Sequence, residues 1–282
     1  MKEAIETIDF HGLEALRLHA PSGAEAIISL YGAQVLSWKT PDKREHLYLS
    51  EAAIFDMQNP IRGGIPISFP QFSGLGKLPK HGFLRKHLWT VTARHAAEGY
   101  VMVSFACRDD DATRHIWPHS FSAELSVALD AERLDVELSV ENIGDGPFSF
   151  TAALHTYLSV AEVESVSLEG LYGFQYRDAL DGDKIKKENI PSLQIEGPVD
   201  RVYHDASRAL LLRDGTKSLG IQNEGFPDVV VWNPWEKSGA ELPDMSKLDF
   251  RHMLCVEAAA AQRLVQLPPG ETWWGRQTLV AM

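Results

Sequence analysis

Two side chains in this sequence, His155 and Glu257, could move protons, and each lies in an apolar run. His155 stands in the run TAALHTYLSV, and Glu257 follows MLCV. An imidazole gives and takes a proton near neutral pH, and burial raises the pKa of a carboxyl group and makes it a stronger base. The two residues could therefore supply a general acid and a general base. Each also has a structural alternative: His155 as a hydrogen-bonded core residue, Glu257 as a rim carboxylate or half of an ion pair.

Two segments set cations among glycines and prolines. They are residues 59–71 (NPIRGGIPISFPQ) and residues 78–85 (LPKHGFLR). Proline restricts the backbone and glycine permits tight turns, so the polar groups stand on a stiff chain, which is more typical of a binding loop than of a linker. We expect the segments to hold an anion, although an exposed surface position would explain any one of these cations alone. The side chains concerned are Arg62, Lys80, His81 and Arg85.

Three further features could contact a ligand that carries hydroxyl groups. Asp200 could accept hydrogen bonds from hydroxyls, or it could cap a turn. The Trp232-Asn-Pro-Trp235 sequence sets two indoles beside a rigid proline, as carbohydrate sites do, and a core aromatic cluster explains it equally well. His81 could bind a sugar or be an ordinary loop histidine.

The elements that must position these residues are short strands. Alternation of apolar and polar residues on both sides of a turn predicts hairpins at 124–141 and 209–222, and further strands at 100–106 and 228–232. Strands joined by turns instead of helices predict an all-β fold, in the form of an antiparallel β-sandwich.

Helical periodicity is scarce. The best helix candidate is 257–262, an alanine-rich run that is too short to be stable as an isolated helix. No change of composition and no flexible linker divides the chain, so we expect one domain over residues 1–282. The longest polar interruption, 233–252, has the length of a loop that is functional or mobile.

The net charge and the cysteine content exclude several classes of function for this protein. A net charge of −12 over 282 residues argues against nucleic acids and anionic membranes as partners, so a recognised anion should be small and held in a cleft. Cys107 and Cys255 are far apart and form no C-x-x-C motif, which predicts core residues. We find no secretory signal, no apolar run of about 20 residues, no nucleotide fingerprint and no metal-ligand spacing. We expect a cytoplasmic protein whose chemistry needs no cofactor and no metal.

Eight ordered motifs resemble the hexose-6-phosphate mutarotases, or glucose-6-phosphate 1-epimerases, of the aldose 1-epimerase superfamily. A match at several ordered motifs is far more specific than a match at one. In chain order the motifs are Tyr31-Gly-Ala-Gln-Val-Leu-Ser-Trp, Ile61-Arg-Gly-Gly-Ile-Pro, Pro79-Lys-His-Gly-Phe, Leu154-His-Thr-Tyr, Val199-Asp-Arg-Val-Tyr, Val231-Trp-Asn-Pro-Trp, Cys255-Val-Glu-Ala and Leu267-Pro-Pro-Gly-Glu-Thr-Trp.

This resemblance implies a large, galactose mutarotase-like β-sandwich with its site in a cleft on one sheet. It implies that Glu257 removes the proton of the anomeric hydroxyl while His155 protonates the ring oxygen; the open aldehyde then rotates and recloses, so both anomers result. The substrate would be a hexose 6-phosphate, in the first place glucose 6-phosphate, and we expect a monomer. The resemblance also implies ligand roles: Arg62 and Arg85 on the phosphate, Asp200 on a hydroxyl, and Lys80 and His81 nearby.

The chain departs from the family pattern beside these ligands. Leu84 and Lys86 flank Arg85 where alanine and asparagine are expected, and Lys80 stands where glutamine is common. The preferred hexose phosphate therefore stays open. Two other functions also stay open: a mutarotase of unphosphorylated aldoses, and a non-catalytic protein that binds carbohydrates or sugar phosphates.

Overall fold

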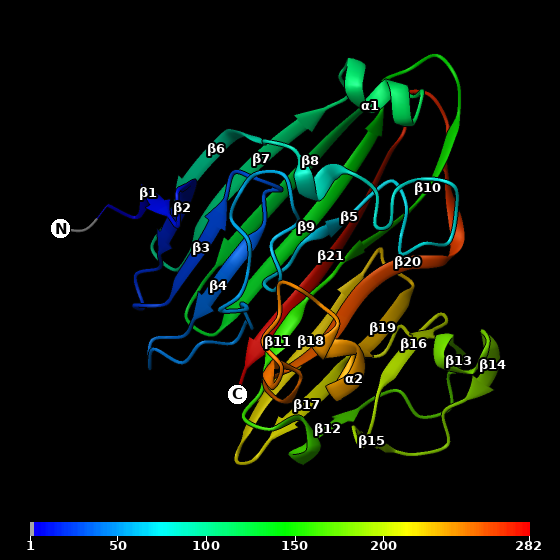
Figure 1. Cartoon of the computed structure of the whole chain (residues 1–282). Helices are drawn as coiled ribbons and strands as arrows, with labels where there is room; N and C mark the ends of the chain where they lie inside the picture. Colours follow the sequence, from blue (N-terminus) through cyan, green and yellow to red (C-terminus); the bar gives the residue numbers. More distant parts are fainter. Residues whose placement is uncertain (1–2) are drawn as a thin grey trace.

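The computed structural model describes residues 3–282, which form three antiparallel sheets (Figure 1). The nine-stranded sheet runs, in spatial order, through β15 (Ser192–Gln194), β12 (Val166–Glu169), β17 (Leu210–Asp214), β18 (Lys217–Glu224), β21 (Thr272–Ala281), β9 (Arg133–Asn142), β8 (Phe121–Leu129), β7 (Val101–Arg108) and β6 (Thr90–Ala96). The eight-stranded sheet runs through β14 (Lys184–Lys187), β13 (Gln175–Asp178), β16 (Val199–Tyr203), β19 (Asp228–Asn233), β20 (Met253–Leu267), β10 (Phe148–Leu154) and β5 (Ile67–Ser68), with β11 (Tyr157–Ser159) also paired to β20. The smallest sheet holds β1 (Ile5–Phe10), β2 (Leu13–His19), β3 (Glu25–Ser29) and β4 (Val35–Lys39).

Helices are short. The α-helices are α1 (Asp111–Ile116) and α2 (Trp235–Ala240), and the 3-10 helices are η1 (Leu84–Lys86), η2 (Val163–Ser165), η3 (Ala179–Asp181) and η4 (Asp249–His252). Within residues 3–282, no helix has both the length and the apolar character needed to span a bilayer.

The predicted all-β class and the predicted strands are confirmed. The hairpin at 124–141 is β8 and β9, and the hairpin at 209–222 is β17 and β18. Along β8, the residues at every second position are buried and those between them are more exposed, which is the period of a strand with one face on the core.

The two large sheets pack against each other through one apolar core. Phe150 on β10 meets Trp273 on β21 edge to face, with 5.4 Å between the ring centroids. Gln277 of β21 crosses between the sheets, and its side-chain amide donates to the carbonyl oxygen of Val256 on β20 at 3.2 Å. Most of the buried valines and leucines of β9, β19, β20 and β21 join the same core cluster, whereas Val230 of β19 belongs to a cluster on the opposite face. The eight-stranded sheet thus has one face in the core and the other free to carry a site.

The prediction of a helix at 257–262 is wrong, because this alanine-rich run lies inside β20. Val256, Ala258 and Ala260 pack in the core between the sheets, whereas Ala259 and Ala261 pack in a separate cluster on the opposite face. A strand that is buried on both faces has apolar residues at every position. The alternation of apolar and polar residues that identifies a strand is therefore absent from its sequence.

The 233–252 segment is not a bare loop. It contains α2 and η4, and Figure 1 shows α2 beside β19. The Asn233 side chain donates to the carbonyl oxygens of Phe250 and Met253, both at 2.8 Å, and the Tyr48 hydroxyl donates to Asp249 at 2.7 Å. These buried and half-buried hydrogen bonds hold the C-terminal end of the segment against its first residue, Asn233, and against Tyr48.

Candidate active site

All seven site residues expected from the sequence line one cleft on the eight-stranded sheet. The cleft has a volume of about 210 Å³ and is bordered on one side by the 233–252 segment, through Leu242 and Asp244. The seven residues are Arg62, Lys80, His81, Arg85, His155, Asp200 and Glu257.

Strand register builds the floor of this cleft. Asp200 on β16 is directly opposite Trp232 on β19, which is opposite Cys255 on β20. In the next row, Val230 on β19 is opposite Glu257 on β20. Side chains two residues apart on a strand share a face, so both rows lie on the side of the sheet away from the core.

His155 lies in the short connection between β10 and β11. Its backbone N–H donates to the carbonyl oxygen of Pro66 at 2.9 Å, and its ring stacks on Tyr157 with 4.8 Å between centroids. Nδ1 of His155 lies 3.3 Å from Oε1 of Glu257, which is ion-pair distance, but their alignment makes no hydrogen bond. Among residues 3–282, neither this Nδ1 nor the buried Oε2 of Glu257 has a hydrogen-bond partner. Packing therefore holds the two groups next to each other and leaves Nδ1 and Oε2 without a competing hydrogen bond.

Burial sets the protonation of this pair. Glu257 is 1% exposed, and burial raises its pKa well above the usual value, with the charge of Asp200 acting in the same direction. Burial lowers the pKa of His155 well below its usual value, and His81 and Arg85 lower it further. Both shifts favour neutral groups, so the resting pair keeps one labile proton on Glu257 and leaves His155 able to accept one.

Replacing Glu257 with glutamine should stabilise the protein at high pH. Because the folded-state pKa of Glu257 is raised above 4.5, the unfolded chain loses this proton first as pH rises. The parent protein therefore loses up to about 1.4 kcal/mol of unfolding free energy per pH unit between the two pKa values, and Glu257→Gln does not. We expect the melting-temperature advantage of the variant to widen from pH 5 to pH 8. A constant or shrinking difference in thermal denaturation would contradict the buried, protonated Glu257.

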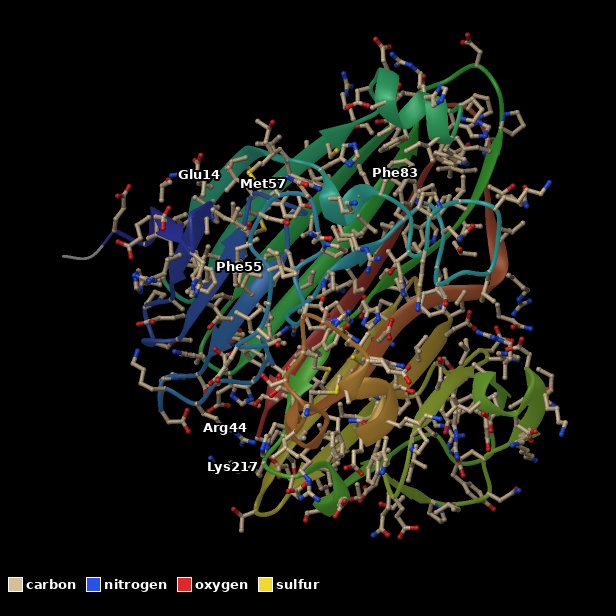
Figure 2. All side chains as sticks on the ribbon, in the orientation of Figure 1. Glu14, Arg44, Phe55, Met57, Phe83 and Lys217 are labelled. Atoms are coloured by element: carbon tan, nitrogen blue, oxygen red, sulfur yellow. The ribbon has the colours of Figure 1, made fainter. Side chains whose placement is uncertain are left out.

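The backbone around Arg62 cannot tolerate larger residues. Gly64 has a φ of 62°, and a Cβ atom there would lie 2.1 Å from the carbonyl oxygen of Val35. Further back in the same loop, Phe55 (Figure 2) stacks on His11 with 4.7 Å between ring centroids, which fixes the loop to the β1–β2 turn. Glycine lets the chain approach β4 closely enough to aim Arg62 into the cleft.

Gln34 fixes the backbone on both sides of Arg62 through two hydrogen bonds. Its fully buried side-chain amide donates to the carbonyl oxygens of Ile61 at 3.1 Å and Gly63 at 2.6 Å, one on each side of Arg62. A buried carbonyl that loses its donor costs about 1–3 kcal/mol. Gln34 therefore holds the orientation of Arg62 without lining the cleft.

Replacing Gln34 with leucine should lower both stability and substrate affinity. The two carbonyl oxygens would lose their donor, and we expect the unfolding free energy to fall by at least about 1–3 kcal/mol. We also expect KM for a phosphorylated substrate to rise several-fold while kcat changes less. Urea denaturation and steady-state kinetics measure these effects, with Gln194→Leu, at an exposed position, as the control. An unchanged KM in a folded variant would show that Gln34 does not position Arg62.

Arg62 is oriented by two partners that the sequence analysis missed. Its Nε and Nη2 atoms both approach Oδ1 of Asp244, at 3.2 and 3.1 Å, and Nη1 donates to the hydroxyl of Tyr157 at 3.0 Å. A guanidinium has five N–H groups, so one N–H on each terminal nitrogen is left for a ligand. The sequence could have pointed to Tyr157, because it follows His155 by two residues in a strand-like run. Nothing in the sequence points to Asp244 except that it lies in a long polar segment.

The second cationic segment is shaped by Gly82. A Cβ atom at this position would lie 1.9 Å from the carbonyl oxygen of Phe69, and φ is 66°. The tight turn lets Nη2 of Arg85 donate to the carbonyl oxygen of Lys80 at 2.9 Å. Nε of Arg85 is buried and has no partner among the described residues, and the charge of Arg62 is one cause of the lowered pKa of Arg85, after burial. Both arginines line the cleft, close enough for their charges to act on each other, and we call them, together with the exposed Lys80, the cationic end of the cleft.

His81 is a neutral donor at the side of the cleft. Burial, followed by the charge of Arg85, lowers the pKa of its imidazole to about 3. Its Nδ1 accepts from the backbone N–H of Ser73 at 3.4 Å and lies 2.9 Å from the hydroxyl of Ser68. Since the backbone N–H can only donate, the ring proton is on Nε2, which suits a hydroxyl oxygen.

Comparison with known proteins assigns this chain to a family. The family model described as Aldose 1-epimerase matches residues 14–279. A protein of Cenchrus ciliaris named "Putative glucose-6-phosphate 1-epimerase" is 38% identical over 96% of this chain and 85% of its own length. A protein of Escherichia coli (strain K12) with the same name is 31% identical over 84% of this chain and 80% of its own length. The crystal structure of a "putative mutarotase" from Salmonella typhimurium has a TM-score of 0.92 and 27% identity, covering 100% of this chain and 94% of the other. This chain therefore belongs to the aldose 1-epimerase family.

Proposed function

We propose that this protein interconverts the α and β anomers of a hexose 6-phosphate, with glucose 6-phosphate as the first candidate. The observation that carries the proposal is one cleft lined by a buried acid–base pair and by two guanidinium groups. The names of its relatives support the same reaction. All of these groups come from one chain, which supports a site that works in a monomer.

Ring opening needs one proton donor and one proton acceptor near the anomeric centre. The proposed roles have Glu257 take the proton of the anomeric hydroxyl while His155 protonates the ring oxygen. The resting pKa directions put the labile proton on Glu257 instead. Reaching the proposed state therefore requires that proton to pass to His155, whose Nδ1 lies 3.3 Å from Oε1. When the aldehyde recloses after rotation about C1–C2, the roles reverse and the proton returns.

The cationic end of the cleft supports a phosphorylated substrate. Arg62 keeps two N–H groups beyond those used by Asp244 and Tyr157, and Nε of Arg85 has no partner within residues 3–282. A phosphate can accept several of these hydrogen bonds at once, and each charge-assisted contact contributes about 1.5–3 kcal/mol. Asp200, at the other side of the floor, suits a hydroxyl group, because its carboxylate makes no hydrogen bond to another described residue.

Anomer exchange of glucose 6-phosphate, followed by magnetisation-transfer NMR, tests the proposal. We expect the purified protein to accelerate exchange of glucose 6-phosphate well above the uncatalysed rate, and exchange of glucose much less. Equal acceleration of both sugars would favour an aldose mutarotase. Saturable binding of glucose 6-phosphate without acceleration would favour a binding protein.

A further inference from the structure

A third donor group lies beside the acid–base pair. The sulfur of Cys255, a ring nitrogen of His155 and a carboxylate oxygen of Glu257 all lie within 4.8 Å of one another. All three residues are buried, with exposed fractions of 0%, 8% and 1% in that order. Cys255 and Glu257 are two residues apart on β20 and share its face toward the cleft, and His155 reaches them from the end of β10.

Two of these groups hold atoms that the fold leaves unsatisfied. Nδ1 of His155 and Oε2 of Glu257 are buried without a hydrogen-bond partner among the described residues. Such atoms are rare in folded proteins, since leaving a buried polar group unpaired is unfavourable. The thiol of Cys255 packs among Tyr48, Tyr157 and Met253. The three donors thus lie close together, and two of them, His155 and Glu257, line the cleft.

We propose that Cys255, His155 and Glu257 form a site for a borderline-soft divalent metal ion, with Zn²⁺ as the type case, and that the bound ion inhibits the protein. Thiolate, imidazole and carboxylate are the three ligand types that Zn²⁺ takes from proteins. The ion would occupy the imidazole and the carboxylate on which proton transfer depends. The inhibition therefore rests on the proposed function, whereas the binding does not.

Distance and charge both suit this ion. Bond lengths of about 2.0–2.3 Å in a tetrahedral site separate neighbouring donors by about 3.5 Å. The 3.3 Å between Nδ1 of His155 and Oε1 of Glu257 matches that separation, and small side-chain movements close the rest. A thiolate and a carboxylate neutralise a dication in the buried site, and His155 and Glu257 line the cleft, from which a water molecule could supply the fourth ligand.

Metal binding must release protons. The ion displaces one proton from the thiol of Cys255 and one from the carboxyl of Glu257, and both protons pass to solvent. Apparent affinity should therefore rise with pH, by as much as about 100-fold per pH unit where both groups are protonated in the metal-free protein. No ligand spacing for this site is visible in the sequence, because His155 lies far along the chain from Cys255 and Glu257.

Titration of the full chain with Co²⁺ tests the binding directly. We expect one equivalent to give tetrahedral d–d bands and a near-ultraviolet thiolate-to-cobalt charge-transfer band. Zn²⁺ should abolish these bands and inhibit anomer exchange with one-to-one stoichiometry. Cys255→Ala should remove the charge-transfer band and, measured against its own metal-free exchange rate, weaken Zn²⁺ inhibition by at least about tenfold. Cys107→Ala, at the other buried thiol, is the matched control and should keep both effects.

Two results would overturn the proposal. One is the absence of a charge-transfer band in the parent protein, and the other is a band or a Zn²⁺ sensitivity that Cys255→Ala retains. If the alanine variant fails to fold, Cys255→Ser offers the same comparison, because the hydroxyl is a much poorer ligand for Zn²⁺. The cobalt spectrum does not depend on catalysis, so failure of the proposed function and failure of the metal site give different results.

Discussion

His155→Ala and Glu257→Gln should each slow the anomer exchange of glucose 6-phosphate by about 100-fold to 10,000-fold, which is the range for loss of a positioned general acid or base. The proposed cycle passes one proton between Oε1 of Glu257 and Nδ1 of His155, which lie 3.3 Å apart, so removing either group also disables the other. Magnetisation-transfer NMR at saturating substrate measures the loss in kcat. His95→Ala and Glu98→Gln, which change the same residue types at exposed positions, are the matched controls and should keep the parent rate.

The double variant sharpens this test. Residues that act as a unit give strongly non-additive losses, so His155→Ala combined with Glu257→Gln should be little slower than the worse single variant. If either single variant retains the parent rate while folded, that residue has no part in proton transfer. Losses that multiply in the double variant would mean that the two residues act independently.

Arg62→Ala combined with Arg85→Ala should lower kcat/KM for glucose 6-phosphate by about 100-fold to 10,000-fold, because two charge-assisted contacts of about 1.5–3 kcal/mol each are lost. Turnover of unphosphorylated glucose should stay within about threefold of the parent, since glucose carries no group for this end of the cleft. The comparison of the two sugars in one variant isolates the phosphate contribution. Arg133→Ala, at an exposed arginine paired with Asp135, is the matched control.

The outcome for glucose decides between functions. If the double arginine variant loses efficiency equally for both sugars, the arginines support the cleft structurally and do not recognise phosphate. If it loses efficiency for neither sugar, the protein is better described as a mutarotase of free aldoses. Single variants then separate the two arginines, because Arg62 is held by Asp244 and Tyr157 whereas Arg85 has fewer partners.

The sequence predicted the strands with one buried face best. On β8 and β9 the alternation of apolar and polar residues follows directly from one face on the core and one in solvent. It failed on β20, where both faces are covered and the alanines at 258–261 imitate a helix. The helix α1 was missed because it spans only six residues, and its capping box at Asp110 and Thr113 lay between two strands.

The sequence allowed us to predict which residue types could act in the site, but not which residues from distant segments contact one another. The cations of 59–71 and 78–85 stood out because glycine and proline surround them, and the structure brings them into the lining of one cleft. The partnership of Arg62 with Asp244 joins residues 182 positions apart and depends on how the 233–252 segment folds back. Likewise, the closeness of Cys255 to His155 follows from strand pairing, which no spacing within one segment encodes.

A crystal structure with 1,5-anhydroglucitol 6-phosphate, which lacks the anomeric hydroxyl and cannot open, tests the central arrangement most directly. We expect its phosphate to accept hydrogen bonds from Arg62 and Arg85 at about 2.7–3.2 Å, and its ring oxygen to lie within hydrogen-bond reach of His155 with C1 beside Glu257. A phosphate bound away from both arginines, or a sugar whose C1 end points away from the acid–base pair, would contradict the account.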